Sequence, residues 1–499
     1  MRTTSMAAEA SEVVVGLDVG TTGVKAIAVA PDGSVAGVAE QGYPLSTPRA
    51  GWSEQDPADW WRGTQAALGA LSAQLGAGCK IGGIGLSGQM HGLVALDAAD
   101  RVVRPAILWN DQRTGAECAE IEERIGLERL IALTGNRALT GFTAPKLLWL
   151  RHNEPESYGR IARIMLPKDY VRLRLTGEWA IDAADASGTL LLDVARRSWS
   201  SEVLDALELP AEWLPPVFES PEVTGTTIAC DDVPRGTPVA AGAGDCAAAA
   251  VGVGIDRPGP LSIVLGTSGV VFAVLPGFAS DPRARVHAFC HAVPGQWHAM
   301  GVMLSAAGSL QWLRDRLAPD TSFADLVAEA EAWGPGADGL LFAPYLAGER
   351  TPHADPSARA AFTGLELRHD RGALVRAVLE GVAFGLRDSL ELVRALGGPA
   401  DRARASGGGA RGLWLQIVAS VLGLPIELTA VEEGSAYGAA LLGGVAGGVF
   451  ADVPDAVARC VRVRTTVDPD PSWQAAYDDT YARFRALYPA LETVKERTP

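Results

Sequence analysis

The chain has 499 residues, a length that predicts two or three domains and excludes a single small module. Hydrophobic residues make up 48% and charged residues 20% of the chain, close to the averages of globular proteins, so the composition excludes a largely disordered protein. The formal net charge is −16, with 43 Lys and Arg against 59 Asp and Glu. This acidic balance disfavours a nucleic-acid-binding surface, so small molecules are the expected partners.

The cysteines and the apolar runs bear on cellular location. The cysteines are scattered, with no Cys-x-x-Cys pair and no metal-ligand spacing, which indicates neither a disulfide framework nor a zinc site. They are Cys79, Cys118, Cys230, Cys246, Cys290 and Cys460. No stretch reaches the roughly 18 apolar residues that a membrane span requires, and residues 1–10 lack the apolar core of a signal peptide. These features predict a soluble protein of the reducing cytoplasm.

The chain opens with β-branched runs. Residues 13–18 and 24–29 have the pattern of two strands joined by a tight turn, and a second turn at residues 31–33 leads into a third strand at 35–38. This order predicts a three-stranded antiparallel meander. Residues 1–12 are expected to form a flexible tail.

Two kinds of signal follow the meander. Asp56 is expected to cap a helix whose first residue is Pro57. The short apolar runs 81–86 and 106–108 then each end in a polar segment. Because open α/β sheets bind ligands beyond the carboxyl ends of their strands, both segments are candidate contacts.

One turn recurs in the middle of the chain. Residues 19–24 read VGTTGV, and residues 265–270 read LGTSGV between two apolar runs. The pair favours a chain built from two related halves, although a coincidence of short Gly/Thr hairpins is the alternative. Glycines let backbone N–H groups converge and hydroxyls add donors, so such turns can hold phosphate oxygens. The candidate residues are Gly20, Thr21, Thr22, Gly266, Thr267 and Ser268.

Two charged residues flank the first turn. Asp18 precedes it, where a carboxylate beside a polyphosphate would hold Mg²⁺ directly or through water. The alternative is a strand-end aspartate that accepts hydrogen bonds from turn amides. Lys25 follows the turn and either counters phosphate charge or faces solvent from its alternating strand.

A glycine-rich segment, SGGGARG, spans residues 406–412 before a helical pattern. Glycines at a helix N-terminus let a nucleotide approach the backbone and the positive end of the helix dipole. The candidate residues are Gly408, Gly409 and Arg411. Alone, such a loop is as often a plain connection, and the two upstream turns give it weight.

Asp245 is the only charge in a stretch of small apolar residues that runs to Gly254. A lone carboxylate there is costly unless it caps a helix or takes part in chemistry. Phosphoryl transfer uses an aspartate that accepts the proton of the attacking hydroxyl, and Asp245 stands between the two halves. We therefore favour a general base, a role compatible with capping.

Taken together, an ordered set of motifs resembles the FGGY carbohydrate kinases over residues 13–487. The set comprises residues 18–25, 52–57, 89–92, 108–111, 167–170, 244–245, 265–270, 348–353 and 407–411. The resemblance implies a duplicated two-domain α/β fold of the actin, hexokinase and Hsp70 type, which is ribonuclease H-like, with ATP and sugar in an interdomain cleft. The implied domains are a sugar-binding domain at 13–256 and a nucleotide-binding domain at 257–487, followed by a tail at 488–499.

The resemblance also implies residue roles. Asp245 would be the general base, Asp18 would act near Mg²⁺, residues 266–268 would hold the transferring phosphoryl group, and Gly408 with Gly409 would approach the adenosine. The sugar contacts would be Met90 and His91, with Trp109, Asn110 and Asp111 in a second tier.

Within the family, the resemblance implies ATP-dependent phosphorylation of D-xylulose at its C5 hydroxyl. Cys246 departs from the pattern, because many members with this substrate carry Asn after the catalytic Asp. A thiol is a weaker hydrogen-bonding group than an amide, so L-xylulose, D-ribulose and glycerol stay open as substrates. A sugar sensor or chaperone-like ATPase on the same fold is the rival from another class, and a homodimer is a further expectation.

Overall fold

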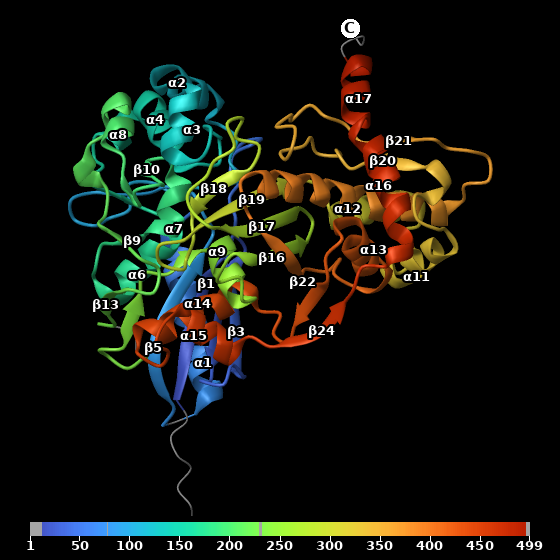
Figure 1. Cartoon of the computed structure of the whole chain (residues 1–499). Helices are drawn as coiled ribbons and strands as arrows, with labels where there is room; N and C mark the ends of the chain where they lie inside the picture. The colour runs from blue at the N-terminus through green and yellow to red at the C-terminus, as the bar shows by residue number, and fades with distance from the viewer. Residues whose placement is uncertain (1–11, 77, 229–231, 496–499) are drawn as a thin grey trace, which may run out of the picture. The chain divides into compact units, whose positions relative to one another are not determined.

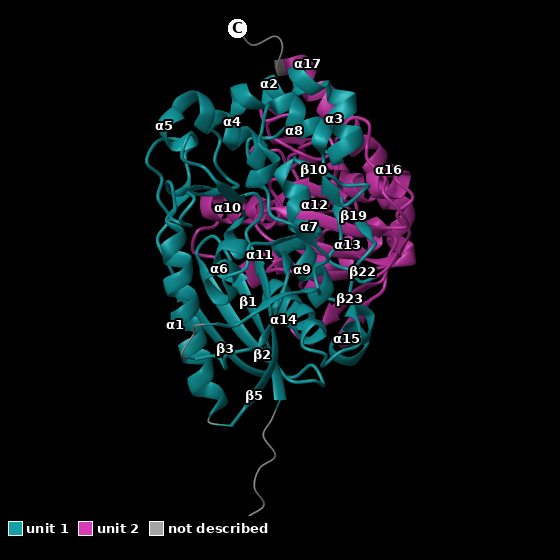
Figure 2. Cartoon of the chain, turned by 90° about the vertical axis from the view of Figure 1, so that its left-hand side faces the viewer, with its two compact units in different colours: residues 1–256, 289–297, 433–461 teal, residues 257–288, 298–432, 462–499 magenta. Residues whose placement is uncertain are grey.

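The computed structural model describes residues 12–76, 78–228 and 232–495, and the chain divides into two compact units (Figure 2). Unit 1 comprises residues 1–256, 289–297 and 433–461, and unit 2 comprises residues 257–288, 298–432 and 462–499. Residues 1–11 of the predicted tail and Cys230 lie outside the described residues. No helix formed by the described residues is long and apolar enough to cross a membrane.

A seven-stranded sheet forms the centre of unit 1, with the order β13-β14-β5-β1-β2-β3 and with β15 beside β5. The strands are β1 (Glu12–Val19), β2 (Gly23–Val29), β3 (Val35–Gly42), β5 (Lys80–Gly88), β13 (Val223–Thr226), β14 (Pro238–Ala240) and β15 (Ala243–Gly244). The antiparallel pairs β1–β2 and β2–β3 confirm the predicted meander. Because β1 and β5 are parallel and pair Asp18 with Ser87, the first turn and the end of β5 share one sheet edge.

Alternate residues of β1 face different layers. Val15 and Leu17 belong to the same apolar cluster as Trp60 of helix α1 (Pro57–Leu75). Gly16 faces α14 (Gly434–Ala446), where a Cβ atom would lie only 1.9 Å from the Ala436 carbonyl oxygen. Glycine therefore allows α14 to lie directly on the strand backbone. The small residues of α14, which are typical of close helix packing, are buried here.

The start of α1 follows the prediction. The Asp56 side chain accepts a hydrogen bond from the backbone N–H of Ala58, and Pro57 is the first helical residue. This N-cap satisfies a backbone donor that the helix leaves unpaired.

The rest of unit 1 is mainly helical between residues 115 and 207, and one further helix starts at residue 245 (Figure 1). Its helices are α2 (Gly115–Ile125), α3 (Leu127–Thr134), α4 (Thr143–Asn153), α5 (Pro155–Tyr158), α6 (Pro167–Thr176), α7 (Ala183–Ala186), α8 (Ser201–Leu207) and α9 (Asp245–Gly252). The short strands β4 (Glu54–Gln55) and β7 (Ala106–Ile107) pair with each other, as do β6 (Val94–Leu96) and β8 (Arg163–Met165), and β9 (Ile181–Asp182) with β12 (Val217–Phe218).

A second seven-stranded sheet, with the order β18-β19-β17-β16-β22-β23-β24, contains most of the strands of unit 2, and β20 (Leu341–Ala343) pairs separately with β21 (Ala361–Thr363). The strands are β16 (Gly259–Leu265), β17 (Gly269–Leu275), β18 (His287–Cys290), β19 (Trp297–Met303), β22 (Ala400–Ser406), β23 (Ile426–Thr429) and β24 (Val463–Val467). Its main helices are α10 (Ala307–Leu317), α11 (Phe323–Glu329), α12 (Arg371–Ala395), α13 (Gly412–Leu422) and α16 (Pro471–Arg485). β16 is antiparallel to β17 and parallel to β22, as β1 is to β2 and β5, so the two sheets begin alike.

The structure divides the chain differently from the predicted boundaries in two places. Residues 289–297 and 433–461 belong to unit 1, although both fall inside the predicted C-terminal domain at 257–487. Residues 433–461 belong to unit 1 because they include α14, whose backbone lies against the glycines of β1 and β5. The helix α15 (Val453–Cys460) follows it into the same unit.

The structure also differs from the prediction of a tail at residues 488–499. Residues 487–495 form the helix α17 (Leu487–Lys495), while residues 496–499 lie outside the described residues. Tyr488 anchors this helix, because its hydroxyl donates to Asp355 Oδ2 at 3.1 Å and its ring stacks on His353 at 3.6 Å.

Candidate active site

The predicted site residues fall into two groups, one in each unit. Unit 1 holds Asp18, Gly20, Thr21, Thr22, Lys25, Met90, His91, Trp109, Asn110, Asp111, Asp245 and Cys246. Unit 2 holds Gly266, Thr267, Ser268, Gly408, Gly409 and Arg411.

The first turn is a β-hairpin that closes with a hydrogen bond from the Gly20 N–H to the Gly23 carbonyl oxygen at 3.0 Å. Side chains from distant segments hold its carbonyl groups. Gln55 Nε2 donates to the Thr21 oxygen at 2.7 Å, and Gln89 Nε2 donates to the Gly20 oxygen at 3.3 Å. The Gly20 N–H closes the turn and the Thr21 hydroxyl donates to Gln89 Oε1 at 3.2 Å, so the other N–H groups of the turn and the Thr22 hydroxyl are its candidate donors for an anion.

Asp18 lies at the end of β1, beside that turn. Ser87 Oγ donates to Asp18 Oδ1 at 2.7 Å. Burial raises the pKa of Asp18, while the Ser87 hydrogen bond and the charge of Lys25 act in the opposite direction. A carboxylate held in this way is a suitable ligand for a hard cation such as Mg²⁺.

Lys25 is engaged by two carboxylates. Its ammonium lies 2.8 Å from Glu40 Oε1 and 2.5 Å from Glu433 Oε2, at the start of α14. These contacts raise the pKa of Lys25 against the effect of burial. The side chain therefore ties β2 to β3 and α14 in this structure and does not extend freely from the turn.

Asp245 is the first residue of α9, directly after β15, and Gly244 is the N-cap. The carboxylate accepts a hydrogen bond from the Cys246 N–H at 2.7 Å. Burial raises the pKa of Asp245 to about 7, and the Asp18 carboxylate contributes in the same direction. The two acidic residues that the sequence singles out therefore interact, and Asp245 has the proton affinity that suits a general base near neutral pH.

Cys246 shares this electrostatic environment. Burial raises the pKa of its thiol well above the ordinary value, and Asp245, Asp18 and Asp185 contribute in the same direction. The thiol therefore stays protonated, which disfavours the redox-sensing role that a low pKa would require. The five cysteines among the described residues form no disulfide.

Met90 and His91 follow β5. Met90 lies against Gly244, where a Cβ atom would be 2.8 Å from Met90 Cγ, so this predicted sugar contact borders Asp245. His91 has a positive φ of 67°, which is uncommon for a residue other than glycine. Its Nδ1 lies 2.8 Å from the Gly188 carbonyl oxygen, so Nδ1 must carry the proton.

The conformation of His91 depends on residues that the sequence did not single out. Its carbonyl oxygen accepts hydrogen bonds from Lys146 Nζ at 2.8 Å and from Thr143 Oγ1 at 3.1 Å, both on α4. Its ring meets Phe142 edge-on, with the centroids 4.7 Å apart. A lone lysine inside the apolar run 143–150 was the available signal, because such a residue needs partners when it is buried.

The three candidate residues that follow β7 differ in their contacts. Trp109 Nε1 donates to Thr21 Oγ1 at 3.0 Å, so this exposed indole reaches the first turn. The Oδ1 atom of Asn110 is buried and has no hydrogen-bond partner among the described residues. Asp111 is fully buried in an ion pair with Arg113, at 2.6 Å, and so supports the loop from within.

The second turn joins β16 and β17, and its support comes from the backbone. The carbonyl oxygens of Gly266 and Thr267 accept hydrogen bonds from the N–H groups of Ala307 and Ala306, each at 2.8 Å. The turn is thus fastened to the start of α10, and Ser268 completes it.

The glycine-rich loop lies beside the second turn. Gly407 has a φ of 92°, and a Cβ atom there would be 2.7 Å from the Leu265 carbonyl oxygen. The Gly409 N–H donates to the same oxygen at 3.0 Å. A Cβ atom on Gly408 would meet no atom within 4 Å, so this face of the loop is open, and the exposed Arg411 is the N-cap of α13.

Comparison with known proteins fits this arrangement. Residues 13–252 match the N-terminal domain, and residues 261–447 the C-terminal domain, of the FGGY family of carbohydrate kinases. The xylulose kinase of Escherichia coli (strain K12) is 42% identical over 484 residues, which cover 96% of this chain and 99% of that protein. The xylulose kinase of Bacillus subtilis (strain 168) is 38% identical over 95% of this chain and 96% of its own length.

Solved structures give the same result. The xylulose kinase from Rhodospirillum rubrum is 36% identical, with a TM-score of 0.92 over 97% of this chain and all of that one. Plasmodium falciparum glycerol kinase with ADP shares the fold, with a TM-score of 0.87 at 20% identity over 95% of this chain and 97% of that one. The predicted two-domain fold of the actin and hexokinase type is confirmed, and the chain belongs to the FGGY family of carbohydrate kinases.

Proposed function

We propose that the chain transfers the γ-phosphoryl group of ATP to the C5 hydroxyl of D-xylulose, giving D-xylulose 5-phosphate and ADP. The observation that carries the proposal is Asp245, a carboxyl group with a pKa raised to about 7 beside Asp18. The xylulose kinases of Escherichia coli and Bacillus subtilis, which are similar over nearly the whole chain, support the choice of sugar.

In the proposed reaction, Asp245 accepts the proton of the C5 hydroxyl. The sugar oxygen forms a bond to the γ-phosphorus, the bond between that phosphorus and the bridging oxygen of ATP breaks, and ADP leaves with the electron pair. A base with a pKa near the working pH is present in its ionised form and still has a useful affinity for the proton. Positioning and charge stabilisation supply the rest of the acceleration.

Mg²⁺ is part of the proposal, and the residues present fit it. Mg²⁺ is usually held by one or two carboxylates together with substrate phosphates and waters, and Asp18 stands beside a phosphate-type turn with Asp245 nearby. Asp18 would hold the ion directly or through water. The ion would neutralise charge on the phosphate oxygens during transfer.

The nucleotide would bind to unit 2. The Gly266-Thr267-Ser268 turn would hold the transferring phosphoryl group, and the open face of Gly408 and Gly409 would approach the adenosine. The fastening of the turn to α10 and of the loop to Leu265 supports this assignment, because a cradle that is already ordered loses little entropy when the ligand binds.

The identity of the sugar depends most on the surroundings of Met90, His91 and Cys246. A protonated thiol at position 246 is a weak hydrogen-bonding group, so L-xylulose, D-ribulose and glycerol are the substrates to compare.

The absence of a membrane-spanning helix and of disulfides among the described residues supports a cytoplasmic location as part of the same proposal.

The test is ADP release with Mg²⁺ and ATP in a coupled assay, with D-xylulose, the three other compounds or no sugar. We expect the highest kcat/KM with D-xylulose, and an Asp245→Ala variant that binds ATP but turns over about 1,000-fold more slowly, within the range for loss of a general base. A higher kcat/KM with another sugar would change the substrate. ADP release that no sugar stimulates would instead favour the sensor or ATPase.

A further inference from the structure

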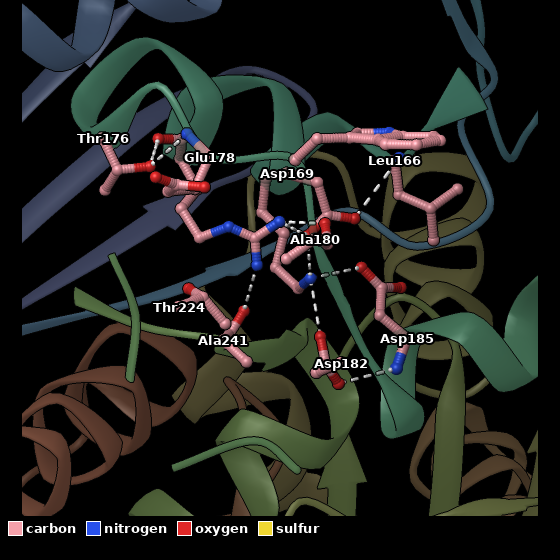
Figure 3. Close-up of polar contacts among 12 residues, drawn as sticks. Leu166, Asp169, Thr176, Glu178, Ala180, Asp182, Asp185, Thr224 and Ala241 are labelled. Atoms are coloured by element: carbon pink, nitrogen blue, oxygen red, sulfur yellow. Dashed lines mark hydrogen bonds and ion pairs between the residues drawn. The ribbon is translucent and has the colours of Figure 1, made fainter. Parts of the chain in front are cut away.

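Unit 1 contains a buried charge cluster that the proposed mechanism does not use (Figure 3). Lys168 Nζ lies 2.6 Å from Asp169 Oδ1, 2.6 Å from Asp182 Oδ1 and 3.3 Å from Asp185 Oδ2. Arg172 lies 3.3 Å from Asp169 Oδ1. The exposed fraction of all five side chains is 1% or less, so three carboxyl groups and two cations share one buried site.

Such a cluster is weak evidence of stabilisation. Removing charges from water costs free energy that their mutual attraction often fails to return, and apolar residues of the same volume frequently give an equally stable protein. Buried ionic groups have a clearer use where they fix one conformation among several. The position of this cluster in the fold indicates which conformation that is.

The cluster borders the segment that leads into Asp245. Arg172 Nη1 donates to the Ala241 carbonyl oxygen at 3.3 Å, three residues before Gly244. Asp185 borders Gly244 itself, because a Cβ atom there would lie 3.2 Å from Asp185 Oδ1. The glycine therefore lets the carboxyl group approach the backbone just before Asp245.

Asp185 differs from the other members in its contacts. Apart from Lys168, its carboxylate oxygens have no polar partner among the described residues, and its ion pair with Lys168 is the longest of the three at 3.3 Å. Asp182, by contrast, caps α7 by accepting from the Asp185 N–H at 2.9 Å. The Asp185 side chain is thus held between Lys168 on one side and Gly244 on the other.

We propose that Asp185 is a positioning residue for Asp245. Lys168 fixes the Asp185 carboxyl group, and that group holds Gly244 and the β15–α9 turn so that the Asp245 carboxylate stays beside Asp18. Met90 packs against the same glycine, so Gly244 lies between the Met90 and Asp185 side chains. This inference rests on the proposed function, since it assigns a role through the general base.

The test compares three variants of the full chain in sugar-dependent ADP release. In Asp185→Ala the contact with Gly244 is lost, and the cluster keeps two carboxylates and two cations, so no charge is left without a counterpart. We expect kcat to fall about 100-fold, the size that a misplaced catalytic group can cause, while KM for ATP changes less than about threefold. Asp185→Asn keeps the shape and should restore kcat to within about tenfold of the parent.

Asp169→Asn is the matched control, because it removes a carboxylate from the same cluster but none of the contacts with the 241–244 segment. Its melting temperature should fall, while kcat stays within about threefold of the parent. If Asp185→Ala does not fold, Asp185→Ser replaces it, with an expected loss in kcat of at least about tenfold. A kcat for the folded Asp185→Ala or Asp185→Ser variant that equals the parent's, or that falls no more than in Asp169→Asn, would overturn the inference.

The parent chain and Asp245→Ala are assayed first. A parent without sugar-dependent ADP release, or an active Asp245→Ala, would overturn the proposed function and this inference together. An active parent, an inactive Asp245→Ala and an unimpaired Asp185→Ala would overturn the inference alone.

Discussion

The two Gly-Thr hairpins have the same backbone plan and different surroundings. In the first, Asp18 precedes the glycine by two residues and Lys25 follows the turn, whereas the equivalent positions in the second are Val264 and Val271. The second hairpin therefore offers only backbone and hydroxyl groups. The charged groups therefore lie in the hairpin of the unit that carries Asp245.

The hairpins also differ in what holds them. Side chains from Gln55, Gln89 and Trp109 hold the first, and backbone N–H groups at the start of α10 hold the second. Side-chain substitutions should therefore disturb the first hairpin most. The second should respond mainly to changes in its own backbone.

The largest effect that separates the hairpins should come from Asp18→Asn. Loss of the carboxylate removes the proposed Mg²⁺ ligand, and we expect kcat to fall about 100-fold or more, as when one group that stabilises transition-state charge is removed. Val264→Ala, at the equivalent position of the second hairpin, is the control and should change kcat less than about threefold. Equal losses in the two variants would contradict the division of roles.

An intermediate effect is expected from Gly266→Ala. A Cβ atom there would meet Ser268 O at 3.5 Å and Val264 at 3.9 Å, which are ordinary contacts, so the protein should fold. The added methyl group would lie at the proposed phosphate cradle and raise KM for ATP about tenfold, equivalent to about 1.4 kcal/mol, with KM for the sugar unchanged. Gly277→Ala, in open space elsewhere in unit 2, is the matched control. A sugar KM that rises with the ATP KM would argue against a nucleotide cradle.

The smallest effect is expected from Lys25→Met. Lys25 pairs with Glu40 and Glu433, so its removal should cost no more than about 1 kcal/mol of unfolding free energy, as for other partly exposed ion pairs. We expect kcat and KM for ATP to change less than about threefold. A rise in KM for ATP above about 30-fold would instead support the phosphate contact that the sequence suggests.

Local patterns in the sequence predicted local structure well. The opening meander, the cap at Asp56 and the helix after the glycine-rich loop depend on neighbouring residues, and all three are confirmed. Contacts across the chain were not readable in this way. Lys25 meets Glu433 408 positions later, and α14 joins unit 1 because its small residues fit the glycines of β1 and β5.

The candidate site shows the same limit. The sequence singled out Asp245 and Asp18 because each is an acidic residue at a strand end, and the structure brings them into electrostatic contact. The sequence did not indicate that Asp111 would be buried in an ion pair with Arg113. Nor did it indicate that Lys146 would hold His91, since the partner of a buried charge depends on how distant helices pack.

The most direct test of Asp245 as the general base is the pH dependence of kcat/KM for D-xylulose between about pH 5.5 and about pH 8.5, because this profile reports the essential groups of the free enzyme. The pKa of Asp245 is raised to about 7, and only its ionised form accepts a proton. Activity should therefore level off above pH 7 and fall about tenfold per pH unit well below it. A profile that stays flat down to the lowest pH would contradict the assignment of Asp245 as the general base.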